Sequence, residues 1–271
     1  MNYFKRALTH TLHSIRKRKG LFILLLALQV IFVISIIAVA IYFQLKIFED
    51  AKGIIEPLQN ANYDANSIEE GTPFTEEMLS IYQSYASLKH NVMVLLAWLL
   101  ALFLCLNSGI WILSHSLLGN LDWKKWKDVG KMWVKNAVST LVLGGSFFII
   151  SYFLLLNTIR AEDTELFART ATILQYSLVV IYYFLLAALA VSHQHSWKGF
   201  VRKIYDISIK NLRKTLPVLL LVISVLLAAG YLVYYSVNND QAFIVLALTS
   251  FFFIVSVVMT RLFWIEALNE L

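Results

Sequence analysis

The chain has 271 residues, of which 59% are hydrophobic and only 15% are charged, and its net charge is +6. Soluble domains carry about 25% charged residues, and the apolar residues here gather into runs of about 20, enough to cross about 30 Å of hydrocarbon. This pattern excludes an ordinary soluble domain, and because the positive charge lies in short segments beside the apolar runs, it favours membrane orientation over nucleic-acid binding.

The apolar runs predict an all-α, polytopic membrane protein that forms a single membrane domain over residues 1–271. The first run follows a basic segment, but it is longer than the apolar part of a signal peptide, so an uncleaved span is predicted. The predicted transmembrane helices are residues 21–43, 91–118, 137–157, 171–192, 216–237 and 242–264.

Basic amphipathic segments precede the first, third and fifth spans, at residues 1–20, 121–136 and 196–215. In the first, Phe4, Leu8, Leu12 and Ile15 share one helical face, which is typical of a helix lying at a membrane surface. In the other two, tryptophans and lysines alternate around the helix and predict membrane-interface anchors. The predicted anchors are Trp123, Trp126, Trp133, Trp197, Lys124, Lys127, Lys131 and Lys135.

Residues 44–90 form the one large hydrophilic segment, and it is acidic. Two apolar series with alternating spacings of four and three predict an antiparallel helical hairpin that projects from the membrane. We expect it to be interrupted near Gly53 and Pro57 and to resume at Thr72-Pro73, a capping residue followed by a proline suited to the first helical turn. The predicted seam residues are Ile47, Ala51, Ile54, Leu58, Phe74, Met78, Ile81, Tyr85 and Leu88.

The distribution of lysine and arginine predicts the orientation. Of the 23 lysines and arginines, 18 lie in segments on the side that holds both termini, so the positive-inside rule places both termini in the cytoplasm. The chain also divides into three units, each an amphipathic helix followed by two spans, and these would be parallel repeats. The alternative is that any six-span protein obeying the positive-inside rule divides in this way.

The spans offer few groups for chemistry. Their cores are predicted to lack Asp, Glu, Lys and Arg, which disfavours a proton or sodium relay. Gln29, Asn107 and Gln175 are the costliest polar groups to bury, so they are candidates to line a cavity, or else they hold the helices together. His115, His193 and His195 fall at one interface, yet the chain has no HExxH motif, no nucleotide-binding motif and a single cysteine, Cys105. No metal, cofactor or catalytic residue is therefore predicted.

The topology resembles that of two groups of proteins. One is the prokaryotic six-span families with an amphipathic helix before each helical hairpin, and the other is the six-span permease subunit of some ABC transporters. The resemblance to the permeases implies that residues 121–136 form a coupling helix that docks a separate ATPase.

The functional prediction is a non-enzymatic multi-pass protein, expected in a prokaryotic plasma membrane. It would act as a scaffold or interaction partner through the outer acidic hairpin at 44–90, which would bind a protein, and a basic inner surface, which would bind anionic lipids of the cytoplasmic leaflet. The alternative is a permease subunit of an ABC-type transporter, and the third hypothesis is an interfacial lipid- or metal-dependent enzyme.

Overall fold

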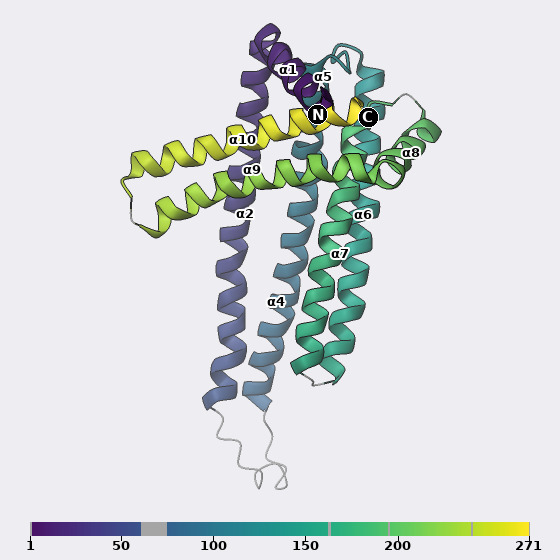
Figure 1. Cartoon of the computed structure of the whole chain (residues 1–271). Helices are drawn as coiled ribbons and strands as arrows, with labels where there is room; N and C mark the ends of the chain where they lie inside the picture. Colours follow the sequence, from purple (N-terminus) through teal and green to yellow (C-terminus); the bar gives the residue numbers. More distant parts are fainter. Residues whose placement is uncertain (1, 61–74, 162–163, 195, 240, 271) are drawn as a thin grey trace. The chain divides into compact units, whose positions relative to one another are not determined.

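The computed structural model describes residues 2–60, 75–161, 164–194, 196–239 and 241–270, and in this part of the chain it contains helices and no strand. The chain forms two compact units. The first comprises Met1–Val30 with Leu104–Leu271, and the second is Ile31–Phe103. The elements are α1 (Asn2–Lys17), α2 (Lys19–Asn60), α4 (Thr75–Leu102), the π-helical turn η1 (Phe103–Asn107), α5 (Ser108–Leu118), α6 (Trp126–Ala161), α7 (Thr164–Ala190), α8 (Trp197–Tyr205), the π-helical turn η2 (Asp206–Lys210), α9 (Leu212–Asn238) and α10 (Phe243–Asn269) (Figure 1).

Six helical segments among the described residues are long and apolar enough to cross a membrane, and each contains or overlaps one of the predicted spans. The prediction of an all-α protein with six candidate transmembrane helices is confirmed at this level, and it is consistent with an integral multi-pass membrane protein. These segments are Lys19–Pro57, Leu79–Leu118, Trp126–Ser151, Ala168–Ala190, Leu212–Asn238 and Phe243–Asn269.

The second unit is an antiparallel pair formed by the part of α2 that follows Val30 and by α4. Asn91 donates a hydrogen bond to Asp50 at 2.7 Å, and Phe32 meets Phe103 edge to face at 5.5 Å between ring centroids. Gly53 allows the closest approach, because a Cβ at this position would lie 2.6 Å from Ser84 Oγ. Contacts therefore run in opposite directions along the two helices, as the hairpin prediction requires.

Two details of the predicted hairpin are wrong. The helix α2 continues through Gly53 and Pro57 to Asn60. Pro57 has no N–H to donate to the carbonyl of Gly53, but it lies in the last turn, so only the end of the helix loses a bond. On α4 the seam passes through Ser84, while Tyr85 is 56% exposed. Leu58, Thr72-Pro73, Phe74 and Met78 lie outside the residues or side chains that the structure describes.

The core of the first unit gathers where α1, α5 and the last turns of α10 pack together. The residues buried there include nearly the whole of α5 and the segment Leu262–Leu268. The helix α1 turns a stripe of small side chains, Ala7, Thr11 and Ser14, into this core, whereas Leu8 and Leu12 remain exposed. Small residues let helices approach closely in a membrane protein, so α1 packs through its small side chains and leaves its leucines outward.

The prediction of a separate amphipathic helix at 121–136 is wrong. Gly119 adopts the left-handed conformation that ends α5, with φ of 88°, and residues 120–125 form turns in which Asp122 accepts a hydrogen bond from the backbone N–H of Lys124. A continuous helix, α6, begins at Trp126 and runs into the third span. The physical reason is burial, because Met132, Lys135 and residues beyond them pack inside the protein and hold the segment in line with the span.

The segment before α9 does contain a separate short helix. Ser196 caps α8, because its Oγ accepts the backbone N–H of Gly199 at 2.9 Å. The turn η2 then leads to Asn211, which adopts non-helical angles before α9. Thr215 Oγ1 donates to the carbonyl of Ile207 and Tyr183 donates to that of Ser208, so side chains satisfy carbonyls that the wider turn leaves free.

Within the first unit, α6 packs against α7 and α9 packs against α10, each as a helical hairpin (Figure 1). The outward residues of these hairpins are large and apolar, as in Val142, Val179, Leu227 and Phe252, all of which are exposed. Such surfaces are expected of helices that face lipid or another membrane protein.

Candidate functional site

A half-buried arginine lies inside the sixth candidate span, which corrects the prediction that the span cores carry no charge. Arg261 on α10 donates from Nη2 to Gln29 Oε1 at 2.8 Å, and its guanidinium carbon lies 5.5 Å from the ring centroid of Trp111 on α5. Its Nη1 is buried, and no hydrogen-bond partner for this atom is found among the described residues. An arginine is costly in hydrocarbon, and here an amide and an indole ring compensate for part of that cost.

Both residues of this pair lie within candidate membrane-spanning helices. Gln29 lies about 15 Å along α2 from Lys19, and Arg261 lies about 12 Å before the end of α10 at Asn269, at 1.5 Å per residue. The two polar groups therefore join the first and sixth candidate spans.

Two of the three predicted cavity residues are buried and the third is exposed. Gln29 is 3% exposed and bound by Arg261, and Asn107 is 8% exposed at the end of η1. Gln175, in contrast, is exposed on α7. The sequence left two roles open for Gln29, which were lining a cavity and holding helices together. Its hydrogen bond to Arg261 corresponds to the second role.

A second polar cluster joins α5 to the end of α7. His115 is fully buried, and its Nε2 donates to the carbonyl of Leu189 at 3.1 Å, which assigns the proton to that nitrogen because a carbonyl can only accept. The rings of His115 and His193 lie 5.0 Å apart between centroids. His195 lies outside the described residues, and no group of three metal-binding side chains is found in the part of the chain that the structure describes.

Lys135, predicted as a membrane-interface anchor, is buried instead. It is 1% exposed, its Nζ donates to the carbonyl of Gln194, and it lies 5.5 Å from the ring of Phe200 and 5.9 Å from the ring of Trp197. The reason is helical position, since Lys135 follows Met132 on the face of α6 that meets the protein. The remaining predicted anchors are exposed, namely Trp123, Trp126, Trp133, Trp197, Lys124, Lys127 and Lys131.

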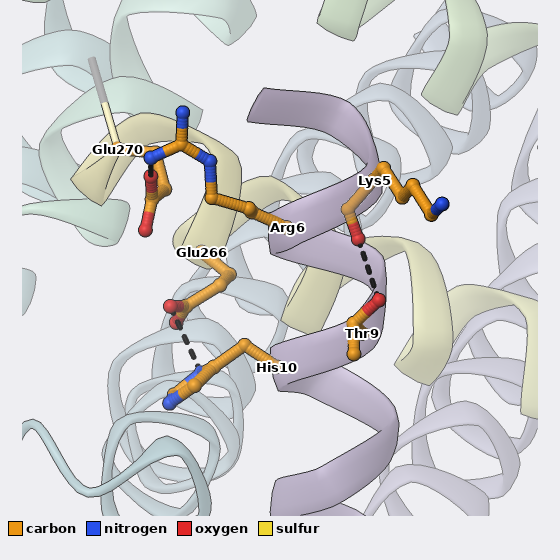
Figure 2. A network of polar contacts seen from close by, with 6 residues as sticks. All are labelled: Lys5, Arg6, Thr9, His10, Glu266 and Glu270. Atoms are coloured by element: carbon orange, nitrogen blue, oxygen red, sulfur yellow. Dashed lines mark hydrogen bonds and ion pairs between the residues drawn. The ribbon is translucent and has the colours of Figure 1, made fainter. Parts of the chain in front are cut away.

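A third polar network fastens α1 to α10. Figure 2 shows Arg6 and His10 of α1 pointing toward Glu270 and Glu266 of α10, while Lys5 points away from them. His10 Nδ1 lies 2.9 Å from Glu266 Oε1, and Arg6 Nη1 lies 3.7 Å from Glu270 Oε2. Glu266 is 7% exposed while the side chain of His10 is 50% exposed, so this contact is partly shielded from water, whereas Arg6 is mostly exposed and contributes little.

Arg18, in the turn between α1 and α2, adds a further fixed point. Its Nη1 donates to the carbonyl of Ser116, near the end of α5. The end of a helix leaves its last carbonyls without helical partners, so a cation there supplies both a hydrogen bond and a favourable charge. The amphipathic α1 is thus held to the spans at both of its ends.

No protein-family model, no curated protein and no solved structure matches the chain. The function is therefore inferred from the residues of this chain. The sequence reasoning missed Arg261 and Lys135 as buried groups, although Arg261 interrupts the apolar run 242–264 and was open to detection there.

Proposed function

We propose that this chain is a non-enzymatic integral membrane protein that acts as a scaffold or interaction partner. A protein would bind the acidic hairpin formed by α2 and α4 outside the cytoplasm, and the basic surface around α1 and the start of α6 would bind anionic lipids inside. The observation that supports this proposal best is that Gln29, one of the candidate cavity residues, is engaged by Arg261 and so joins two helices.

The orientation and the repeat belong to the same proposal. Both termini would lie in the cytoplasm, as the lysine and arginine distribution favours. The separate short helices α1 and α8, which precede α2 and α9, support the first and third of the three proposed units. The second unit differs because α6 has no break between its basic start and its span.

The surface of the proposed outer hairpin supports a protein partner. Phe48 is 69% exposed and Tyr82 is 68% exposed, on helices that also carry Glu49, Asp50 and Glu56. Exposed aromatic residues are enriched where proteins bind one another. An apolar surface with an acidic margin would suit a partner that offers basic residues around an apolar centre.

Site-specific photo-crosslinking tests the proposal. A photoreactive phenylalanine analogue replaces Tyr82 in the hairpin, and a matched variant carries it at Tyr176, which is 70% exposed on α7. The proposal expects a discrete protein adduct at Tyr82 in the native membrane and none at Tyr176. Absence of any adduct at Tyr82, together with solute flux by the purified protein in liposomes, would refute it.

The permease hypothesis has its own test. Co-purification of an ATPase that is lost on combined Trp126→Ala and Trp133→Ala, with the protein still folded, would favour it. The two tryptophans are exposed at the start of α6, 80% and 40% respectively, so their removal alters a surface rather than the core.

A further inference from the structure

A small cavity lies at the junction of the turn after α5, the first turns of α6 and the turn after α7. Its volume is about 150 Å³. It is lined by side chains of both charges, with Lys125, Lys131 and Lys135 on one hand and Asp122 and Asp128 on the other. All of these residues belong to the first unit.

The opposite charges around this cavity do not neutralise one another directly. In the ranges that the structure describes, no ion pair joins any of the three lysines to Asp122 or Asp128. A ligand that carries a negative and a positive group would therefore find a partner for each. Lys135 is 1% exposed, so its ammonium is held rigidly in the wall, and it has N–H groups beyond the one given to Gln194.

The surroundings of the cavity indicate a lipid as the source of the ligand. Trp123 and Trp126 flank it in sequence and are 52% and 80% exposed. Exposed tryptophans beside a transmembrane helix lie at the level of lipid head groups. The cavity therefore opens where a phosphate and its attached head group are present at high concentration.

The charges select one type of head group. Phosphoethanolamine carries a phosphate, which lysines bind, and a primary ammonium, which donates hydrogen bonds to carboxylates. Phosphoglycerol lacks the cation, so it would offer Asp122 and Asp128 only neutral hydroxyl donors and no charge to balance theirs. Phosphocholine has a cation with no N–H group, so it offers these carboxylates no hydrogen bond.

We propose that this cavity is a binding site for the phosphoethanolamine head group of a membrane lipid, with the phosphate on Lys125, Lys131 and Lys135 and the ammonium on Asp122 and Asp128. The proposal rests on the proposed function only in taking the chain as a membrane protein whose basic face meets the lipid surface. It adds a specific zwitterionic lipid to the general attraction for anionic lipids.

Lipid retention by the full-length protein tests this site. The protein is placed in nanodiscs containing equal amounts of phosphatidylethanolamine, phosphatidylglycerol and phosphatidylcholine with identical acyl chains, and the lipids that stay bound are counted by native mass spectrometry. One charge-assisted hydrogen bond corresponds to about a tenfold change in binding, so phosphatidylethanolamine should exceed each of the other lipids by about tenfold.

Two variants separate the halves of the site, and a third serves as control. Asp128→Asn should remove the preference for phosphatidylethanolamine over phosphatidylcholine, whereas Lys131→Gln should weaken retention of every lipid. Asp206→Asn makes the same change of charge outside the cavity and should leave the preference intact. Tryptophan fluorescence checks that each variant is folded, and a variant that unfolds is replaced by Asp122→Asn for the carboxylate half.

The other outcomes overturn the proposal. Equal retention of phosphatidylglycerol and phosphatidylethanolamine would show a simple anion site, and an unchanged preference in Asp128→Asn would show that the carboxylates take no part. Saturable binding of soluble phosphoethanolamine without retention of the lipid would assign the site to a free small molecule. Nanodiscs expose both faces of the protein, so a wrong orientation or a missing hairpin partner affects the crosslinking test and leaves this one unaltered.

Discussion

The hydrogen bond between Gln29 and Arg261 gives the sharpest prediction, and the perturbation is Gln29→Leu. The substitution removes the only side-chain acceptor that Nη2 of Arg261 has among the described residues. Because Nη1 is already buried without a partner there, the guanidinium is left beside an apolar side chain and the ring of Trp111. The variant should therefore be less stable, although leucine is the more apolar side chain.

The magnitude follows from the geometry of this contact. A hydrogen bond of 2.8 Å to a charged group contributes about 1.5–3 kcal/mol, whereas bonds between transmembrane helices contribute about 0.6 kcal/mol on average and at most about 1.7. For a charged donor that has no alternative partner, we expect a contribution near the upper value for bonds between transmembrane helices. Gln29→Leu should therefore lower the free energy of unfolding by about 1–2 kcal/mol. Replacing both residues by leucine removes the stranded charge and should cost less than the two single changes added together.

The assay is a double-mutant cycle on unfolding by denaturing detergent, followed by the fluorescence of the seven tryptophans. We expect a coupling energy of about 1 kcal/mol or more between Gln29→Leu and Arg261→Leu. The matched control is Gln175→Leu, the same change at an exposed position in another span, which should leave stability unchanged or raise it. Additive costs in the cycle, or equal costs for Gln29→Leu and Gln175→Leu, would refute this reasoning.

Three further predictions concern the other contacts. Gly53→Ala should separate α2 from α4 and cost about 1–3 kcal/mol, because its new methyl group meets Ser84 Oγ at 2.6 Å, and Ser84→Gly in the same chain should restore most of the loss in thermal unfolding. Lys135→Met should cost about 1 kcal/mol in the same measurement, because the partly buried carbonyl of Gln194 loses its donor. His10→Ala should speed amide hydrogen exchange in α1 severalfold, while Arg6→Ala, whose ion pair is exposed, should not.

The apolar runs made the six candidate spans predictable. Runs of that length avoid water by crossing a membrane. The apolar runs did not predict which side of each helix packs against the rest of the protein. In a membrane the apolar side of a surface helix meets lipid, so Leu8 and Leu12 are outward and the small residues Ala7 and Thr11 are inward. In the sequence of α1, the stripe of small side chains was the feature that marks the face packed against the protein.

The candidate site was harder to predict than the spans. Lys135 lies in a segment with the composition of a surface anchor. It is buried because Met132 and its neighbours pack against α5 and α7, and this packing is not visible in the sequence. Arg261 lies near the end of the predicted span 242–264, where one charge is consistent with either the span or the segment after it. Its bond to Gln29 joins residues far apart in the chain, and no local spacing predicts such a pairing.

The packing of α1 against α10 has a consequence for the order in which the protein assembles. The ribosome completes α10 roughly 250 residues after α1, which takes about 12–50 s at typical rates of synthesis. Throughout that interval α1 and Gln29 lack α10, whereas Arg18 can bind the carbonyl of Ser116 as soon as α5 has been made. The first helices therefore enter the bilayer without α10, and the contacts made by Glu266 and Arg261 form only after α10 has been synthesised.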